Sequence, residues 1–168
     1  MAEPSDVSTD RDPIDDFIAR WAHVRGMTGE FLESAPDALL DFVPAPGFVS
    51  VRDQASHLVE VQGVYQEVLA EGELVDFSHK SRYTPAGTES DVILAALTRM
   101  DADLEQQLAG LRPRAASWTV DWFGSQIGVA GFGAVLIQHE ALHHGQWALH
   151  AHLEGSPLPI GWVLNWGL

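Results

Sequence analysis

The chain has 168 residues and is 46% hydrophobic, which is enough to build one core of ordinary density and predicts a single domain. Twenty-four acidic residues against nine basic ones give a formal net charge of -15. Because this charge repels a phosphate backbone, we expect no direct nucleic-acid binding. The sequence contains no cysteine, so a metal site has to use His, Asp or Glu, and no disulfide or cysteine nucleophile is available.

Residues 1–12, MAEPSDVSTDRD, are polar and acidic, and we expect a flexible tail there, followed by a single domain over 13–168. Acids stand where a signal peptide has a basic start and an apolar run. No later stretch has about eighteen consecutive apolar residues, so we expect no membrane span. These features predict a cytoplasmic protein.

Apolar spacing predicts four long amphipathic helices along the chain. Ser50 with Asp53, and Thr88 with Asp91, have the spacing of helix-capping pairs. Residues 72–87 form a long connection between the second and third helices. By residue range, we expect the helices at 13 to about 32, 50–72, 88–110 and 128–153.

Two further segments are distinctive. Residues 117–125, SWTVDWFGS, alternate aromatic and β-branched side chains, but the segment is too short to found a sheet. The C-terminal PLPIGWVLNWGL, 157–168, is too apolar to lie in water, and we expect it to pack back across the helices. The pattern as a whole predicts an all-α, four-helix bundle with a long crossover loop between helices 2 and 3. Helices 2 and 4 can then face each other across the core.

Three histidines share inward-facing positions in this arrangement. His139 and His143 are one helical turn apart, so both rings can point at one ion, and His57 lies on the inward stripe of the second helix. Three neutral imidazoles that converge between helices can hold zinc with a fourth position open. A histidine pair at this spacing is also common as hydrogen-bonded or interfacial residues, so spacing alone leaves both interpretations open.

The remaining histidines are predicted to lie away from this group. His150 shares the stripe but is about 10 Å beyond His143 by helix rise, so we expect it in the core or at a dimer interface. For four others we expect solvated surface positions: His23, His79, His144 and His152.

The letters H-E-x-x-H at 139–143 also match the motif of zinc peptidases, in which the glutamate is a general base. A metzincin would need glycine and histidine where this chain has Gln146 and Leu149. Other zincins use a downstream glutamate as the third ligand. Glu154, the only acid after the motif, lies on or just beyond the same helix and cannot fold back to the metal. A zinc peptidase is therefore a remote alternative.

Two stretches carry a resemblance to a known family. FVSVRDQASHL (48–58) and IQHEALHHGQ (137–146) resemble the helix-2 and helix-4 motifs of the DinB-like superfamily, the DinB/YfiT-like metalloenzymes. The similarity extends over the long loop and the end at 157–168, and His144 stands where the family has a basic residue before Gly-Gln. The resemblance implies a four-helix bundle, a frequent homodimer and a site for zinc, nickel or a similar divalent ion, with the ligands carried onto His57, His139 and His143.

The resemblance also bears on activity, because the superfamily includes thiol-dependent S-transferases, isomerases and hydrolases. It implies a metal-dependent transferase of the thiol S-transferase type, or a hydrolase, acting on a small-molecule substrate, with a low-molecular-weight thiol as candidate cosubstrate. The alternative is a non-catalytic, metal-binding stress protein whose ion holds helices 2 and 4 together.

Other residues are candidates for roles around the ion, whose open position favours an anion such as hydroxide or a thiolate. Glu140 is the candidate catalytic base at the rim, although its place about 100° around the helix from His139 also fits a solvated glutamate. Asp53 and Glu60, about one turn before and after His57, are candidates to orient its ring, with capping as the other role of Asp53. The candidate pocket residues are Tyr65, Trp118, Trp122, Phe123 and the inward-facing Gln146. For the four aromatic residues, packing in the core is the alternative role.

Overall fold

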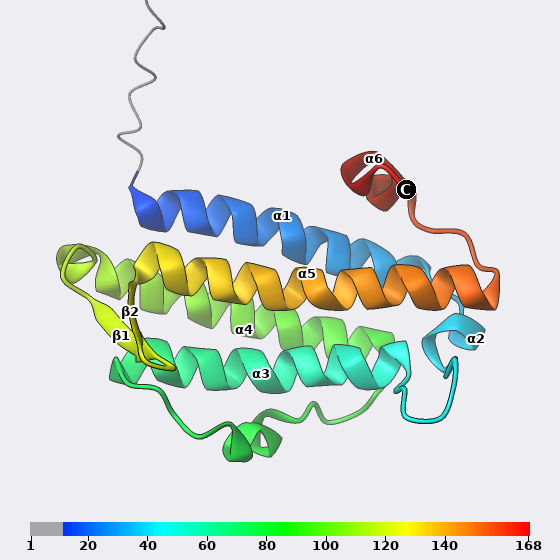
Figure 1. The fold of residues 1–168 in the computed structure, drawn as a ribbon, viewed down its shortest axis with the longest axis horizontal. Helices are drawn as coiled ribbons and strands as arrows, with labels where there is room; N and C mark the ends of the chain where they lie inside the picture. The colour runs from blue at the N-terminus through cyan, green and yellow to red at the C-terminus, as the bar shows by residue number, and fades with distance from the viewer. Residues whose placement is uncertain (1–11) are drawn as a thin grey trace, which may run out of the picture.

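The computed structural model describes residues 12–168, so the expected tail lies outside the described residues except for Asp12. Four long helices pack side by side as a bundle (Figure 1), which confirms the predicted all-α fold. Helix α1 contacts α4 and α5, and α3 contacts the same two, so the four helices form a closed ring of neighbours. Their bounds are α1 (Pro13–Ser34), α3 (Val51–Glu71), α4 (Ser90–Leu111) and α5 (Val129–Glu154).

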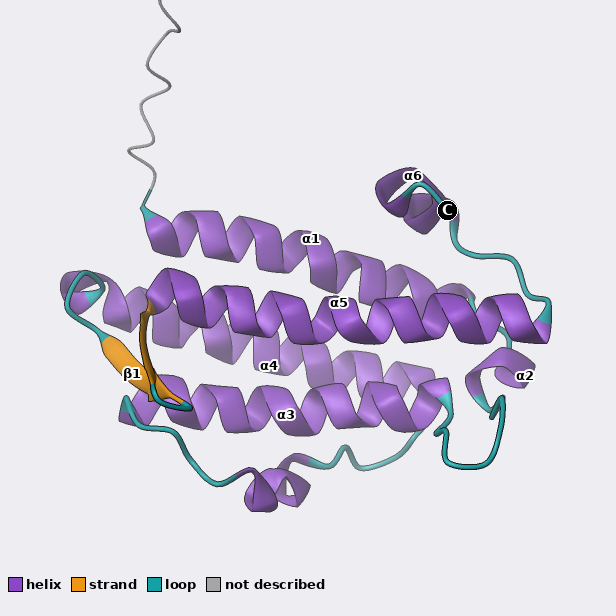
Figure 2. Ribbon diagram, in the orientation of Figure 1, coloured by secondary structure: helices purple, strands orange, loops and turns teal. Residues whose placement is uncertain are grey.

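Short elements connect and cover the bundle, and Figure 2 shows how little strand the fold contains. None of the helices within residues 12–168 is both long and apolar enough to cross a membrane. The short elements are the helix α2 (Asp37–Leu40), the 3-10 segments η1 (Phe77–Tyr83) and η2 (Arg112–Arg114), the strands β1 (Thr119–Trp122) and β2 (Ser125–Gly128), and the C-terminal helix α6 (Ile160–Trp166).

Local sequence signals explain where the first two long helices begin. Asp12 accepts a hydrogen bond from the backbone N–H of Ile14 at 2.8 Å, so it caps α1 and belongs to the folded domain rather than to the expected tail. The capping pair at α3 is confirmed, because Ser50 Oγ accepts from the Asp53 N–H at 3.0 Å. Helix α3 ends at Gly72, whose positive φ of 73° favours glycine.

The expected capping pair at the start of α4 is wrong. The residue that precedes this helix is Glu89, and no side chain caps it. Asp91 instead accepts a hydrogen bond from the neighbouring Val92 N–H at 2.9 Å. A spacing of three residues allows a helix cap but does not ensure one, because the capping residue must also have an extended backbone directly before the first helical residue.

The crossover loop runs back along the bundle, as predicted. Helices α3 and α4 point in the same direction (Figure 1), so the chain must return along the length of α3 before α4 begins. The loop is held against α3 by Tyr83, whose ring lies so close to Gly63 that a Cβ there would be 2.1 Å from it. The Tyr83 hydroxyl also donates to Glu67 on α3. These contacts fix η1 beside the middle of the bundle.

The segment before α5 forms a sheet, which corrects the expectation that it is too short for one. β1 and β2 pair antiparallel, with Val120 opposite Ile127. The turn residues Phe123 and Gly124 both have positive φ, 50° and 87°, which is the geometry that a two-residue hairpin turn requires. Asp121 accepts from the Gly124 N–H at 2.6 Å and supports this turn.

The C-terminal segment packs back on the bundle, as expected from its apolar sequence. Trp162 of α6 is fully buried, and its Nε1 donates to the Met27 carbonyl at 2.8 Å. Its ring lies 4.7 Å from Phe31 and stacks on Trp147 with 6.3 Å between ring centroids. Helix α6 therefore closes one side of the core formed by α1 and α5.

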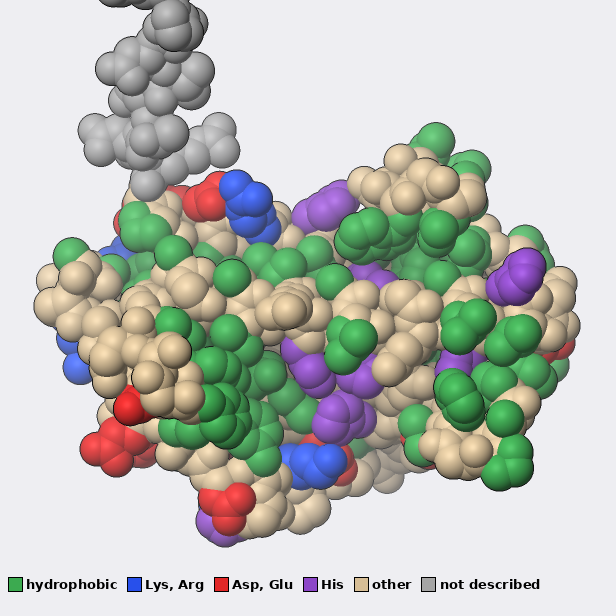
Figure 3. All heavy atoms as spheres, viewed as in Figure 1, with side chains coloured by type: hydrophobic (Ala, Val, Ile, Leu, Met, Phe, Trp, Pro, Cys, Tyr) green, Lys and Arg blue, Asp and Glu red, His purple; other side chains and the backbone are tan. Residues whose placement is uncertain are grey.

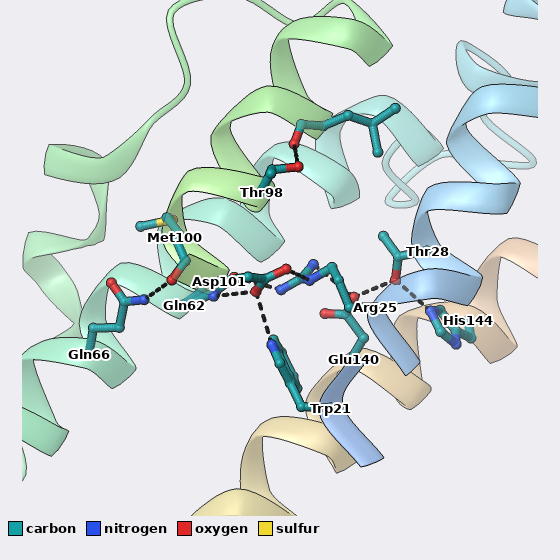
Figure 4. A network of polar contacts seen from close by, with 11 residues as sticks. Trp21, Arg25, Thr28, Gln62, Gln66, Thr98, Met100, Asp101, Glu140 and His144 are labelled. Atoms are coloured by element: carbon teal, nitrogen blue, oxygen red, sulfur yellow. Dashed lines mark hydrogen bonds and ion pairs between the residues drawn. The ribbon is translucent and has the colours of Figure 1, made fainter. Parts of the chain in front are cut away.

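A buried polar layer divides the apolar core along the bundle axis. Each long helix contributes one residue to it: Arg25, Gln62, Asp101 and Glu140 (Figure 4). Nη1 of Arg25 lies 2.9 Å from Glu140, its Nη2 donates to Gln62 at 2.5 Å, and its Nε lies 3.1 Å from Asp101. Gln62 in turn donates to Asp101 at 2.9 Å. The apolar residues on either side of this layer form two separate clusters.

Candidate metal centre

The three histidines predicted to meet do meet in the structure. His57 on α3 lies 5.4 Å from His139 and 5.4 Å from His143 on α5, measured between ring centroids, and the two α5 rings are 4.9 Å apart. One ring nitrogen of each lies within 4.8 Å of the other two. Figure 3 shows histidine side chains gathered on the open face between α5 and α3. The structure therefore brings together the three histidines that the helical-face argument selected.

The donor set fits a divalent ion such as zinc. Nitrogen ligands at about 2.0–2.1 Å in tetrahedral geometry stand about 3.3 Å apart, so small side-chain rotations would close the three rings around an ion. Among residues 12–168, this is the group of three or more His, Asp or Glu side chains that could hold one. Within this described range the group contains no fourth His, Asp or Glu, so an ion held there would keep a coordination position for an external ligand.

Electrostatics keep the three imidazoles in the neutral form that binds metal. Burial, reinforced by neighbouring imidazoles, lowers the pKa of His139 to about 4 and that of His143 to about 3. Burial also lowers the pKa of His57, followed by the charge of Lys80, while Glu60 acts in the opposite direction.

Gln54 on α3 orients His143, and the sequence analysis did not identify it. Its side-chain oxygen accepts from Trp147 Nε1 at 3.1 Å and lies 3.1 Å from His143 Nδ1. Because an indole nitrogen can only donate, the group facing both rings is the oxygen, and His143 Nδ1 must carry the proton. Nε2 of His143 is then free for the ion. The available signal was the position of Gln54, buried and one turn before His57 on α3.

Lys80 was also missed, because the crossover loop has no periodicity that predicts where a side chain points. Its Nζ lies 3.4 Å from Nδ1 of His57. The two residues expected to orient His57 have other partners. Asp53 completes the helix cap with Ser50 Oγ at 2.7 Å, and Glu60 accepts from the Thr84 hydroxyl at 2.5 Å.

Glu140 does not lie at the rim or in solvent, which corrects both expectations for it. The side chain is 2% exposed, and its carboxylate faces α1, where it pairs with Arg25 and accepts from the Thr28 hydroxyl (Figure 4). Burial raises its pKa, and Arg25 and Thr28 oppose that rise. A zinc peptidase needs this glutamate beside the metal, whereas Glu140 faces α1, so its position argues against the peptidase alternative.

The other histidines follow the predictions with one exception. His150 is buried in the core, with Nε2 3.0 Å from the Val49 carbonyl, and three others are exposed, as expected: His23, His79 and His152. His144 is only 1% exposed, so the predicted surface position is wrong. Its Nε2 lies 2.8 Å from the Thr28 hydroxyl, and its ring centroid is 4.6 Å from that of Trp162.

A cavity of about 560 Å³ opens beside the histidines. Its walls are mainly apolar, and His139 forms part of them; the lining is Tyr65, Trp122, Val135, Gln138, His139, Ala141 and Leu142. The larger hollow between α1 and α5, about 790 Å³, contains none of the three candidate ligands. The smaller cavity is therefore the one that an ion at the site would face.

Only part of the predicted pocket lines this cavity. Tyr65 and Trp122 do, with 5.7 Å between their ring centroids. Trp118 is buried in the core against Phe132, which is the alternative role expected for it. Phe123 is 73% exposed at the hairpin turn. Gln146 is exposed rather than inward-facing.

The fold and the site together define a class: a four-helix bundle with an open three-histidine centre between two helices. The family model of the DinB superfamily matches residues 20–147, and the chain belongs to that superfamily. This match includes all three histidines, the whole of α3 and most of α5. No protein of curated function matches the chain significantly.

Proposed function

We propose that this protein is a divalent-metal-dependent enzyme that acts on a small molecule, either as a transferase of the thiol S-transferase type or as a hydrolase. The observation that carries the proposal is the open face of the three-histidine group, which meets an apolar cavity rather than a fourth protein ligand. Zinc and nickel are among the ions that suit imidazole ligands, and they are the ions that the family resemblance implies. A divalent ion there supplies Lewis acidity and lowers the pKa of a thiol or water that reaches it.

The residues of the chain have separate roles in this proposal. His57, His139 and His143 would hold the ion in a fixed place, and Gln54 keeps His143 in the tautomer that binds it. The apolar cavity excludes water from the reacting group and orients it. Because the chain contains no cysteine, the thiol in the transferase version must come from a low-molecular-weight cosubstrate.

The test begins with elemental analysis of protein purified without chelator, beside His57→Ala and the exposed-histidine control His152→Ala. We expect about one transition-metal ion per chain in the wild type and in the control, and loss of the ion in His57→Ala. The metal-loaded protein is then screened with simple electrophiles, with and without low-molecular-weight thiols. A wild type that takes up no ion on reconstitution contradicts the proposal.

Removal of the ion separates catalysis from a structural role. The enzyme proposal expects turnover to disappear while far-ultraviolet circular dichroism stays unchanged. A large drop in melting temperature, with no reaction found in the screen, would favour the non-catalytic alternative, in which the ion joins α3 to α5.

A homodimer is the partner that the family resemblance implies, and we propose α5 and α6 as its interface. These two helices expose the apolar side chains of Leu149, Leu153, Ile160, Leu164 and Trp166, and Leu168 lies just after α6. Leu164 is the most exposed of them, at 77%. Sedimentation of the wild type beside Leu164→Glu tests the proposal, which fails if the wild type sediments as a monomer.

A further inference from the structure

Lys80 is the only lysine in a chain with a formal net charge of -15, and it lies beside the candidate metal centre. Its ammonium nitrogen is 3.4 Å from Nδ1 of His57. Within the described part of the chain, no carboxylate lies close enough to Lys80 to form an ion pair with it. The side chain is half-buried, so this positive charge is kept at the site without an acidic partner.

An ion at the site would leave Lys80 without its present partner. A neutral imidazole has one unprotonated nitrogen, which can bind either a metal ion or a hydrogen-bond donor. When His57 uses that nitrogen as a ligand, the Lys80 ammonium has no acceptor left on the ring. A half-buried ammonium in that position favours an anion, because an unpaired charge away from bulk water is unfavourable.

The same 3-10 segment packs against the aromatic wall of the cavity. Phe77 and Lys80 are three residues apart in η1, and side chains at this spacing eclipse each other on one side of a 3-10 helix. The Phe77 ring centroid lies 5.8 Å from that of Tyr65 and 6.3 Å from that of Trp122, and these two residues line the cavity. One face of η1 therefore contacts both the aromatic residues of the cavity wall and His57.

We propose that the substrate is a small amphiphilic monoanion, with an apolar ring or short chain in the aromatic cavity and a carboxylate held by Lys80 next to the ion. This inference rests on the proposed function and names the class of molecule that the site takes. In Figure 3, apolar side chains gather on one side of the central histidines, and a basic side chain lies directly beside them. Both features are on the open face between α5 and α3.

Lys80 is the cationic side chain in contact with a candidate ligand, and it matches a carboxylate with a single negative charge. A phosphate monoester carries nearly two negative charges at neutral pH and would leave one of them without a side-chain partner. A volume of about 560 Å³ lies within the usual range for small-molecule sites and accommodates one ring.

Binding measurements test the substrate class on the metal-loaded full chain. Phenylacetate is the probe, with three comparison ligands: 2-phenylethanol lacks the charge, acetate lacks the ring, and phenyl phosphate carries a second charge. Lys80→Met removes the ammonium but keeps the stem. Arg82→Met is the matched control, because Arg82 is exposed in the same segment, 3.9 Å from Glu67 rather than at the histidines.

We expect calorimetry to show that Lys80→Met weakens phenylacetate binding by about 10- to 100-fold, the usual effect of a hydrogen bond to a charged group. Binding of 2-phenylethanol should not change in that variant, and Arg82→Met should bind all four ligands as the wild type does. Val135→Trp fills the cavity and should weaken both ring ligands without affecting acetate.

The single lysine gives a second measurement that does not depend on affinity. Reductive methylation with ¹³C-formaldehyde keeps the charge and labels one lysine side chain, so phenylacetate should shift one lysine resonance, and 2-phenylethanol should shift it much less. Equal phenylacetate affinity in the wild type and Lys80→Met overturns the inference. Three other outcomes also overturn it. Phenyl phosphate binds more tightly than phenylacetate, acetate binds as tightly as phenylacetate, or phenylacetate does not bind at its highest soluble concentration.

Metal content, measured in the same samples, distinguishes the two possible failures. If the wild type contains no metal ion, the proposed function itself is contradicted. If the wild type is fully loaded with metal but Lys80→Met binds phenylacetate equally well, only the proposed substrate class is contradicted. The proposed metal-dependent activity is then unaffected. Circular dichroism and metal content of Lys80→Met must match those of the wild type for the comparison to count.

Discussion

Gln54 holds His143 in the tautomer that leaves Nε2 available, through a contact of 3.1 Å between Oε1 and Nδ1. We expect Gln54→Leu to weaken zinc affinity by roughly 10- to 100-fold, the usual effect of losing a partner that orients a histidine ligand. Titration of metal-free protein with zinc against a competing chelator measures the change. The matched control is Gln66→Leu, a buried glutamine on the same helix that donates to the Met100 carbonyl at 2.5 Å. Equal losses of affinity in the two variants would contradict a specific role for Gln54.

Arg25 neutralises two buried or partly buried carboxylates, those of Glu140 and Asp101. Arg25→Met leaves both without a cation, and we expect it to lower the free energy of unfolding by about 3–5 kcal/mol. Adding Glu140→Gln to Arg25→Met should recover part of this loss, because the buried charge is gone. Urea unfolding of the two single variants and the double variant gives the coupling energy. Strict additivity would mean that the pair is not coupled.

The same change tests whether Glu140 takes part in chemistry. Glu140→Gln alone keeps the shape of the side chain and its acceptor oxygen toward Arg25 and Thr28. Because the carboxylate faces α1, we expect metal affinity and any turnover in this variant to stay within about 2-fold of the wild type. A loss of 100-fold or more, at normal metal content, would restore it as a catalytic base.

Buried neutral histidines predict that the metal-free protein loses stability in acid. The folded-state pKa values are about 4 for His139, about 3 for His143 and about 4 for His144, below the ordinary value of 6.5. Between about pH 6.5 and pH 3 the unfolded chain binds more protons, so the free energy of unfolding falls as pH falls, and above pH 6.5 these groups add no slope. Glu140, whose pKa is raised by burial, opposes this trend. His139→Gln should flatten the slope of stability against pH, whereas His152→Gln, at an exposed position, should leave it unchanged.

Trp162 is the main attachment of α6 to the bundle. We expect Trp162→Ala to destabilise the protein by about 3–5 kcal/mol, because it removes a fully buried aromatic side chain and the bond to the Met27 carbonyl. Trp166→Ala, in the same helix but 47% exposed, should change stability by less than about 0.5 kcal/mol. Thermal and urea unfolding measure both. Similar small effects in the two variants would mean that α6 contributes little to the core.

Much of the fold could be predicted because each long helix carries its signals within its own sequence. Pro13, the Ser50–Asp53 cap and Gly72 act over a few residues, and the structure places helix ends there. The histidine triad could be predicted for the same reason, since its members follow from helical phase. The hairpin could not, because strand 125–128 is short and largely exposed, and its partner stabilises it only after folding.

Two of the errors on α5, those for Glu140 and His144, have one physical cause. A helix that packs on one neighbour buries one stripe, but α5 contacts α1, α2 and α3, and the C-terminal segment covers it further. Glu140 and His144 therefore lie on a face that is exposed in a simple helical wheel yet is buried by α1 and Trp162. Lys80 lay beyond prediction, because nothing in the loop sequence indicates that η1 docks beside His57.

The polar layer determines how far each helix can slide along its neighbours. If one helix shifted by a turn, its polar member would leave its partners and meet aliphatic side chains, which strongly disfavours every alternative alignment. Glu140 follows His139 directly in α5, and Gln62 lies little more than a turn after His57 in α3. The polar side chains on the hidden side of these two helices therefore set the height along the bundle axis at which the imidazoles meet on the open side, through contacts that do not include the candidate ligands.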